Sequence, residues 1–361
     1  MRIVTVNAGS TGFKIERYDI DSPLPPLADP PPPAFSVQTA AVEDGLAKAL
    51  HAEADIVAHR FVRLPDGSPP VLRLDQDGTE RIAGVAGEAP LHDSRALEAV
   101  ATVRRLRLNL PQIAVADGSF HRTMPAAATT YALPRELTRA GLRRLGYHGL
   151  SHEYAAHRAC ALAGVDIARA RVVTAHLGGG SSLSAIRAGA SIDTTMGYTP
   201  LEGLPMATRS GSVDPGLLLH LLRGGMTLAE LENMLEHRSG LFGISGRSGD
   251  VRELLAVPDD PDARLALDVL GWRLRAGIGA MIGVLGGVDV IAFTGGVGEH
   301  AAEIRASGVQ GAAAAGAILD DRRNASLREE GRISGDRSRV AVYVVAAREG
   351  WQLARAAFTA L

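Results

Sequence analysis

Two short stretches of this chain combine glycines, hydroxyl side chains and one polar residue at the end of an apolar run. They are residues 6–14 (VNAGSTGFK) and residues 175–182 (AHLGGGSS). In each, the apolar run predicts a buried strand and the residues after the glycines predict a second strand, so both are expected to be β-hairpins. The backbone N–H groups of such a turn can bind an anion such as a phosphate group. A plain hairpin turn has the same pattern, but two matched copies favour phosphate binding.

A third glycine-rich stretch, residues 295–301 (GGVGEHA), follows an apolar run and precedes a predicted helix. It differs from a dinucleotide-binding fingerprint, because Ala301 occupies the last glycine position and no acidic residue follows in a β-α-β context. No stretch matches the G-x-x-x-x-G-K-[ST] pattern of a P-loop. Phosphate contacts are therefore expected from turn N–H groups and hydroxyls at the two hairpins, rather than from a helix N-terminus.

The repeat of the hairpin about half a chain apart predicts two related α/β domains, since 361 residues with 46% hydrophobic content can form two cores. A ligand is then expected in the cleft between the domains. Ser151 is the predicted N-cap of a helix that ends at Gly164, and Asp214 and Pro215 begin another helix. Apolar runs predict strands at residues 56–62, 114–118 and 288–296, and a terminal helix is predicted at residues 349–361.

The overall composition excludes several classes of protein. A net charge of −2 gives no electrostatic attraction to nucleic acid or to an anionic membrane. The N-terminus lacks the apolar segment of an export signal, and the longest nearly apolar run, residues 276–288, is too short to span a bilayer. The single cysteine, Cys160, cannot form an internal disulfide, which suits a cytoplasmic protein, and its alanine-rich surroundings predict a buried, unreactive thiol.

Nine motifs make the chain similar to the acetate kinase family, within the sugar kinase and actin superfamily. They occur in the family order over nearly the whole chain, and the block at residues 193–216 is highly specific. The motifs are VNAGSTGFK, HRFV, APLHDS, ADGSFHRTMP, RRLGYHGLSH, HLGGGSS, DTTMGYTPLEGLPMATRSGSVDPG, SGLFGISGRSGDVR and FTGGVGEH. The resemblance implies an α/β fold of two duplicated ribonuclease H-like domains of the acetate and sugar kinase/heat-shock cognate/actin superfamily. The first would comprise residues 1–118 and 350–361, and the second residues 119–349.

The family transfers a phosphoryl group between ATP and a short carboxylate, so the resemblance implies Mg²⁺-dependent (or Mn²⁺-dependent) acetate kinase activity that yields acetyl phosphate and ADP. Such a transfer depends on alignment and charge neutralisation more than on covalent catalysis. The resemblance also implies a cytoplasmic homodimer that pairs through its second domain. Its expected partners are ATP and acetate or another short-chain carboxylate, with no nucleic acid and no membrane.

The residues that match the family motifs take their expected roles from the resemblance. Arg60 and Arg209 match two active-site arginines, and a planar guanidinium can hold a carboxylate or a transferring phosphoryl group through paired hydrogen bonds. His148 matches the histidine that hydrogen-bonds the phosphoryl oxygens in the transition state, as an imidazolium or as a neutral donor. Asp117 matches a magnesium-linked acid. A zinc site at His148 and His152 is not expected, because no further ligand is spaced nearby.

The resemblance also implies the binding residues. Metal ligation or orientation of metal-bound water is expected from Asn7, Asp117 and Glu349, with the two carboxylates on different domains. The acyl pocket, small and mostly apolar, is expected at Val62, Leu91, Tyr147 and Pro200. Nucleotide contacts are expected from Lys14, His176, Gly178, Gly179, Gly180, Asp250, Val251, Arg252, Gly296, Val297, Gly298 and Glu299. Residues 295–299 are expected to form a turn beneath the base, and a plain position on the strand surface is the alternative for Lys14.

Several positions depart from the family pattern: RLPDG replaces HGG after the arginine strand, AREG replaces the C-terminal TDEE-type motif, and four single residues differ. Gly12 replaces a serine, Gly179 and His300 each replace an asparagine, and Tyr147 replaces a phenylalanine, so that its buried phenol requires a hydrogen-bond partner. At Gly179 the backbone cradle is expected to stay while one amide donor is lost. Two alternatives therefore stay open: a relative that uses propionate, butyrate or pyrophosphate, and a non-catalytic protein that binds nucleotide or acyl phosphate. The retained catalytic residues argue against the second alternative.

Overall fold

The chain folds into two compact units in a computed structural model that describes residues 1–9, 12–65, 67–84 and 90–360, without the side chains of residues 90–93. Unit 1 comprises Met1–Ser119 and Arg348–Leu361, and unit 2 comprises Phe120–Ala347. Each unit is built on a six-stranded sheet with its own helices.

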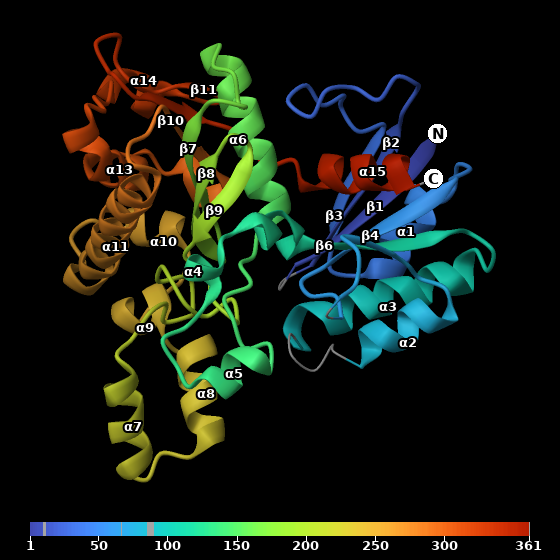
Figure 1. Ribbon diagram of the computed structural model, residues 1–361, viewed down its shortest axis with the longest axis horizontal. Coiled ribbons are helices and arrows are strands. Elements are labelled where there is room, and N and C mark those ends of the chain that lie inside the picture. Colours follow the sequence, from blue (N-terminus) through green and yellow to red (C-terminus); the bar gives the residue numbers. More distant parts are fainter. Residues whose placement is uncertain (10–11, 66, 85–89, 361) are drawn as a thin grey trace. The chain divides into compact units, whose positions relative to one another are not determined.

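The sheet of unit 1 has the strand order β3-β2-β1-β4-β6-β5. Strands β1, β4 and β6 run parallel to one another, whereas β2, β3 and β5 each run antiparallel to the strand they join. Helices α1 and α3 lie on one side of this sheet and α15 lies on the other (Figure 1). The elements are β1 (Arg2–Ala8), β2 (Phe13–Asp19), β3 (Phe35–Thr39), α1 (Val42–Ala49), β4 (Ile56–Phe61), β5 (Val71–Arg73), α2 (Gln76–Ala83), α3 (Pro90–Leu106), β6 (Gln112–Ala116) and α15 (Glu349–Ala360).

The sheet of unit 2 repeats this plan in the order β9-β8-β7-β10-β12-β11, with the same parallel and antiparallel pairs. The long helix α11 packs against β8, and α6 packs against β7 and β10. The strands are β7 (Arg171–Leu177), β8 (Ser181–Arg187), β9 (Ala190–Thr194), β10 (Val290–Thr294), β11 (Gly331–Arg332) and β12 (Ala341–Val344). The longer helices are α6 (Gly149–Ala163), α7 (Pro215–Arg223), α8 (Leu228–His237), α11 (Pro261–Leu285) and α13 (Ala302–Val309). The short helices are η2 (Asp117–Thr123), which begins in unit 1, α4 (Ala126–Thr129), α5 (Arg135–Arg139), α9 (Gly240–Ser245), α10 (Val251–Leu255), α12 (Gly295–His300), η3 (Gln310–Ala315) and α14 (Asp321–Ser326).

Both predicted hairpins are confirmed. Strands β1 and β2 pair from Arg2 opposite Asp19 up to Ala8 opposite Phe13. Strands β7 and β8 pair in the same way, up to Leu177 opposite Ser181. The apolar strand residues are buried in the sheet, which explains why these runs are hydrophobic.

The helix signals are only partly confirmed. Asp214 caps α7 by accepting a 2.9 Å hydrogen bond from the N–H of Gly216, and Gly164 ends α6 in the left-handed conformation, at φ 66°. The prediction of Ser151 as an N-cap is wrong, because α6 begins at Gly149 after His148, which has φ 56°. The left-handed backbone of His148 turns the chain into the helix earlier than a serine cap would.

Two other expectations concern the body of the chain. Residues 295–299 do not form a turn but the first residues of α12, since the chain enters a helix directly after β10. Cys160 is buried as predicted, and burial raises the pKa of its thiol to about 12. No helix of the described ranges is long and apolar enough to cross a membrane.

Candidate active site

A polar cluster in unit 1 lies at the carboxyl ends of the parallel strands. Asn7 and Arg60 are the last residues but one of β1 and β4, and Asp117 follows β6 directly. Arg60 donates through Nη1 to Asn7 Oδ1 at 3.1 Å and through Nη2 to Asp117 Oδ2 at 2.9 Å. Asn7 in turn donates through Nδ2 to Glu349 Oε2. The carboxyl ends of parallel strands meet at one edge of a sheet, which is where ligands bind in open α/β folds.

Glu349 belongs to this same cluster, so the expectation of two carboxylates on different domains is wrong. The chain returns to unit 1 at Arg348, and Glu349 therefore begins α15 beside β1. The oxygens of Asn7, Asp117 and Glu349 are hard donors of the kind that Mg²⁺ prefers. No group of three or more His, Cys, Asp or Glu residues in the described ranges could hold a metal alone. A magnesium ion here would therefore need water and phosphate oxygens as further ligands, as is usual for this ion.

The second cluster lies in unit 2, where the hairpin between β7 and β8 meets a histidine and an arginine. A Cβ atom added to Gly180 would lie 3.1 Å from His148 Nε2 and 3.7 Å from Arg209 Nη2. Glycine thus allows the hairpin backbone to approach both side chains closely. The sequence places these three residues far apart, and the fold of unit 2 brings them together.

Arg209 is a partly buried cation that forms no ion pair with a carboxylate among the described residues. Its Nη1 donates to the carbonyl oxygen of Pro200 at 2.9 Å, and no Asp or Glu in the described part of the chain forms an ion pair with it. Burial lowers the pKa of its guanidinium, although the charge of Glu236 acts in the opposite direction. A desolvated guanidinium that lacks an anionic partner is stabilised when an anion binds.

Two histidines, one serine and one threonine form a series of hydrogen bonds at the same hairpin. The Nδ1 atom of His148 lies 2.8 Å from Ser182 Oγ, and Ser182 Oγ also lies 2.8 Å from Nε2 of His152. The other ring nitrogen of His152, Nδ1, lies 2.7 Å from Thr174 Oγ1. His152 is completely buried, and desolvation, followed by the charges of His121 and His176, holds the pKa of its imidazole well below the ordinary value. Sequence reasoning missed Ser182 and Thr174, because buried hydroxyls in a strand carry no distinctive signal.

The glycines of this hairpin differ in how closely they are packed. The N–H of Gly178 donates to the carbonyl oxygen of Gly180 at 3.0 Å, which closes the turn. A Cβ atom at Gly179 would meet no other atom within 4 Å, and its φ is not in the left-handed region. The glycine that replaces the family's asparagine is therefore not required by space or by backbone conformation.

The other predicted nucleotide residues lie at helix starts in unit 2 or on β2. Asp250 caps α10 through the N–H of Arg252 at 2.8 Å and accepts from Arg252 Nη2 at 2.6 Å, which lowers the pKa of Asp250. Val251 is buried beside them. The residues Gly296, Val297, Gly298 and Glu299 lie on α12, as described above. Lys14, on β2 of unit 1, places Nζ 3.1 Å from Oε1 of buried Glu16.

Arg305 is a residue that sequence reasoning missed. It is almost fully buried and donates to the carbonyl oxygens of Gly298 (3.1 Å) and Glu299 (2.8 Å) at the end of α12, as well as to Asn324. Burial lowers the pKa of its guanidinium. Arg305 therefore fixes α12 against α14, and the sequence of α13, which also contains Glu303 and Ser307, does not single it out.

The predicted acyl residues are divided between the units. Val62 is buried in unit 1, and Tyr147 is buried in unit 2, where its hydroxyl donates to the carbonyl oxygen of Tyr198 at 2.5 Å. The phenol of Tyr147 thus has the partner that its burial requires. Pro200 accepts the hydrogen bond from Arg209 described above. The side chain of Leu91 lies outside the described residues.

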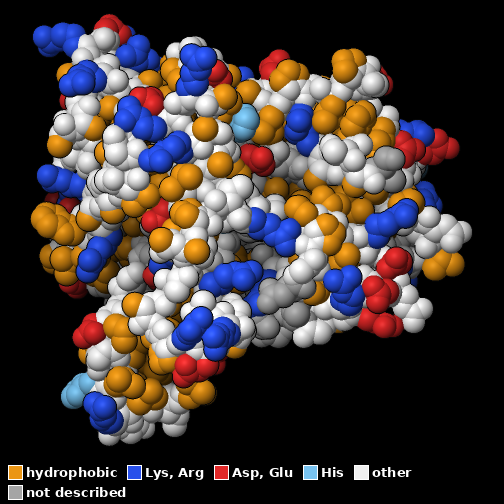
Figure 2. Space-filling view, in the orientation of Figure 1, with side chains coloured by type: hydrophobic (Ala, Val, Ile, Leu, Met, Phe, Trp, Pro, Cys, Tyr) orange, Lys and Arg blue, Asp and Glu red, His pale blue; other side chains and the backbone are white. Residues whose placement is uncertain are grey.

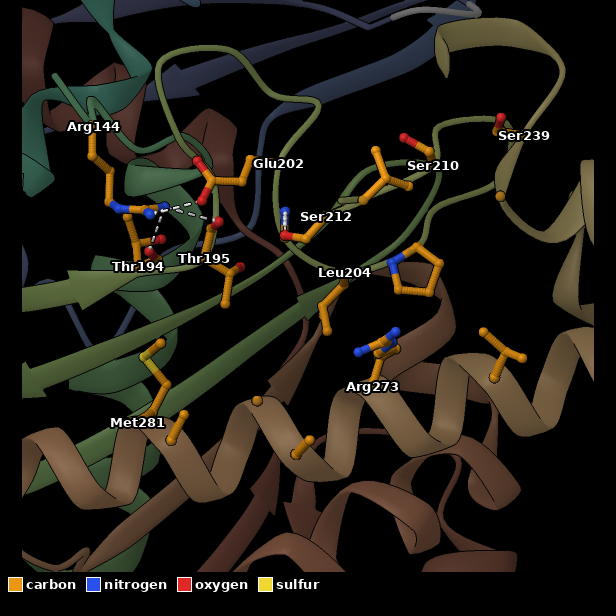
Figure 3. Close-up of a pocket in the computed structure, with 18 of the residues that line it drawn as sticks. Arg144, Thr194, Thr195, Glu202, Leu204, Ser210, Ser212, Ser239, Arg273 and Met281 are labelled. Atoms are coloured by element: carbon orange, nitrogen blue, oxygen red, sulfur yellow. Dashed lines mark hydrogen bonds and ion pairs between the residues drawn. The ribbon is translucent and has the colours of Figure 1, made fainter. Parts of the chain in front are cut away.

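A large cavity of unit 2, about 990 Å³, contains none of the predicted site residues. It lies between α9, α11 and the segments that follow β9 (Figure 3). On one wall Arg144 donates to Glu202 Oε1 at 2.8 Å and to the carbonyl oxygens of Thr194 and Thr195, so this cation is already neutralised. Arg238 and Arg273 also line this cavity, so a cation alone does not distinguish it from the cluster around Arg209.

The duplicated six-stranded unit, with a glycine-containing hairpin in each copy, is the architecture of the sugar kinase and actin fold class. A sequence model of the Acetokinase family matches residues 34–355. The chain belongs to the acetokinase family.

Individual relatives agree with this assignment. Acetate kinase of Nostoc punctiforme is 42% identical over 319 residues, which cover 87% of this chain and 79% of the relative. Acetate kinase of Acaryochloris marina is 36% identical and covers 99% of both chains. Among solved structures, acetate kinase of Porphyromonas gingivalis has a TM-score of 0.86 at 31% identity over 99% of both chains. A propionate kinase of Francisella tularensis has a TM-score of 0.85 at 30% identity over 98% of both.

Proposed function

We propose that this protein is an acetate kinase, which transfers a phosphoryl group reversibly between ATP and acetate. It is thus a phosphotransferase with a carboxyl group as acceptor. Family membership supports the reaction, and the observation that carries it to particular residues is the partly buried Arg209 beside Gly180 and His148. Phosphoryl transfer spreads negative charge over the equatorial oxygens, and a desolvated cation next to hydrogen-bond donors stabilises that charge.

The residues of unit 2 would act on the phosphoryl group and the nucleotide. Arg209 and His148 would hydrogen-bond its oxygens, and the backbone of Gly178, Gly179 and Gly180 would line the phosphates. The start of α12 would lie beneath the base, with Asp250 and Arg252 near the ribose and adenine. Each of these roles is a charge or a donor held in place by the contacts described above.

The residues of unit 1 would bind the acetate and the metal. Arg60 is oriented by Asn7 and Asp117, and its guanidinium is suited to a carboxylate. Asn7, Asp117 and Glu349 would hold a hydrated Mg²⁺, which when bound neutralises phosphate charge. The shared contacts among these four side chains keep their polar atoms in fixed directions before any ligand arrives.

Propionate is a second acceptor to consider. The solved propionate kinase named above matches this chain as closely as the solved acetate kinase does. One additional methylene changes the binding free energy in an apolar pocket by about 1–3 kcal/mol. We therefore expect the protein to prefer one acid over the other without excluding either.

We also propose that the protein is a cytoplasmic homodimer. The buried, unpaired thiol of Cys160 suits a reducing compartment. Figure 2 shows hydrophobic side chains on the surface over α7 and α8, at the lower left. The exposed large apolar residues of α7, α8, α9 and α11 include Leu217, Leu219, Leu222, Leu228, Phe242, Leu265 and Trp272. A second copy would cover such a surface, and sedimentation of the Trp272→Lys variant against wild type would test this.

A hydroxamate assay tests the proposed reaction. Acetate, propionate and butyrate would each be offered with ATP or pyrophosphate, and hydroxylamine would trap any acyl phosphate. We expect trapping with acetate and ATP. Trapping with pyrophosphate but not with ATP would identify pyrophosphate as the donor. If no combination of acid and donor gave trapped acyl phosphate, only a binding function would remain.

A further inference from the structure

Four side chains of unit 2 form a continuous hydrogen-bonded chain that ends at the catalytic histidine. Its order is Thr174, His152, Ser182 and His148, and consecutive atoms are 2.7, 2.8 and 2.8 Å apart. Thr174, His152 and Ser182 are completely buried. Each hydroxyl and each neutral imidazole in such a chain has a single proton to donate.

The number of available protons decides which group donates and which accepts in each of these hydrogen bonds. His152 is buried and neutral, so only one of its two ring nitrogens carries hydrogen. If His152 Nδ1–H donated to Thr174, the hydroxyl proton of Thr174 would have no acceptor among the described residues. An unsatisfied buried donor is costly, whereas the opposite direction satisfies every group.

The favourable direction fixes each proton in turn. Thr174 Oγ1–H donates to His152 Nδ1, and His152 Nε2–H then donates to Ser182 Oγ. Ser182 Oγ–H therefore donates to His148 Nδ1, which must be the unprotonated nitrogen of that ring. The single proton of neutral His148 is then on Nε2, the atom that lies 3.1 Å from a Cβ placed at Gly180.

We propose that Thr174, His152 and Ser182 are positioning residues that hold His148 as the neutral Nε2–H tautomer, with its proton directed at the phosphate hairpin. His148 would thus act as a neutral hydrogen-bond donor to the phosphoryl oxygens and not as an imidazolium. Protonation of His148 at Nδ1 would leave one buried hydroxyl proton without an acceptor: that of Ser182 if its oxygen accepted from both rings, or that of Thr174 if every hydrogen bond reversed its direction. The proposal rests on the proposed function only for the role of His148, since the position of its proton can be measured without turnover.

The charged and titratable groups around His148 are consistent with a neutral ring. His176 of β7 stacks against it, Arg209 approaches the same glycine, and His152 lies in the first turns of α6, which begins directly after His148. His121 of η2 contacts His152 edge-on. Arg209 is a permanent cation, so a second positive charge on His148 would be repelled by it.

Nitrogen-15 NMR of histidine-labelled protein, in long-range proton–nitrogen spectra, tests the proposal directly. We expect the wild-type ring of His148, assigned by comparison with His148→Asn, to be neutral and protonated at Nε2 at neutral pH. Thr174→Val is nearly isosteric, removes the first donor and lies two side chains away from His148. It should give a mixture of the two His148 tautomers and lower kcat about tenfold, with KM for acetate unchanged.

Two further variants separate positioning from general damage to the fold. Ser182→Ala should also mix the tautomers and lower kcat. Ser184→Ala removes another buried hydroxyl of β8, bonded to the carbonyl oxygen of Asp193, and should change neither the tautomer nor kcat. A proton on Nδ1 of wild-type His148 would overturn the proposal. It would also be overturned if Thr174→Val and Ser182→Ala both left the tautomer and kcat unchanged. If the wild-type protein showed no acetate kinase activity but His148 still carried its proton on Nε2, only the proposed function would be contradicted.

Discussion

The imidazole rings of His148 and His176 stack face to face, with their centroids 4.3 Å apart and an angle of 24° between their planes. Each ring is held by a serine: Ser182 Oγ lies 2.8 Å from His148 Nδ1, and Ser151 Oγ lies 2.8 Å from His176 Nδ1. Two imidazolium ions at this separation would repel strongly, so the stack opposes simultaneous protonation of both rings. The serines fix the ring planes, so both imidazoles stay oriented in the absence of a ligand.

Arg209→Ala should lower kcat by roughly 10²-fold or more, because it removes one charge contact to the transition state. The hydroxamate assay measures the effect. Arg135→Ala provides the control, since Arg135 is an exposed arginine of α5 in the same unit. Unchanged turnover in Arg209→Ala would refute the catalytic role of Arg209.

Gly179 and Gly180 should respond differently to substitution, although they are neighbours. Gly180→Ala places a methyl group 3.1 Å from the ring of His148, so the ring must move and kcat should fall about tenfold or more. Gly179→Ala should be silent, because that position is open. Gly179→Asn should fold normally and lower KM for ATP by restoring an amide donor. Equal loss of activity in both alanine variants would contradict the difference in packing between Gly179, which is open, and Gly180, which lies against His148.

Removal of magnesium with a chelator should abolish activity, and added Mg²⁺ should restore it. Glu349→Gln keeps an oxygen that can accept from Asn7 but removes the negative charge. We expect this variant to fold and to require a higher Mg²⁺ concentration for half-maximal activity. Full activity of wild type in the presence of chelator would rule out the metal roles of Asp117 and Glu349.

Acid should destabilise unit 1 through His59. This histidine is completely buried on β4, and desolvation lowers the pKa of its imidazole to about 4, against 6.5 for the unfolded chain. The unfolded state therefore binds a proton that the native state does not bind between these values. His59 contributes a loss of about 3 kcal/mol in the free energy of unfolding as pH falls from above 6.5 to about 4. Denaturant unfolding at several pH values would measure the slope, which should be smaller in His59→Leu.

Cys160 should not react with a thiol reagent in the native protein, since burial raises the pKa of its thiol to about 12. Because it is the single cysteine of the chain, its labelling reports unfolding without interference from other thiols. One equivalent of label should appear only above the unfolding midpoint in denaturant. Rapid labelling of the native protein would show that α6 opens locally.

The sequence predicted the hairpins, the buried strand β10 and the start of α7, because each depends on a local pattern of apolar residues, glycines or caps. It failed at the start of α6, where His148 adopts a left-handed backbone that no local pattern signals. The membership of Glu349 in unit 1 depends on where the chain crosses back, which is a property of tertiary packing. The hydrogen-bonded chain through Ser182 depends on contacts between β7, β8 and α6, so it becomes visible only in the folded unit.

The two sheets carry different side chains at equivalent positions. Asn7 is the sixth of seven residues in β1, and His176 is the sixth of seven in β7. Their cross-strand partners, Lys14 and Ser182, are likewise both the second residues of β2 and β8. The equivalent strand positions thus carry an amide and a lysine in unit 1, and an imidazole and a hydroxyl in unit 2. Because the two sheets share one strand order and hairpin register, each unit can serve as a template for redesigning the other at these positions.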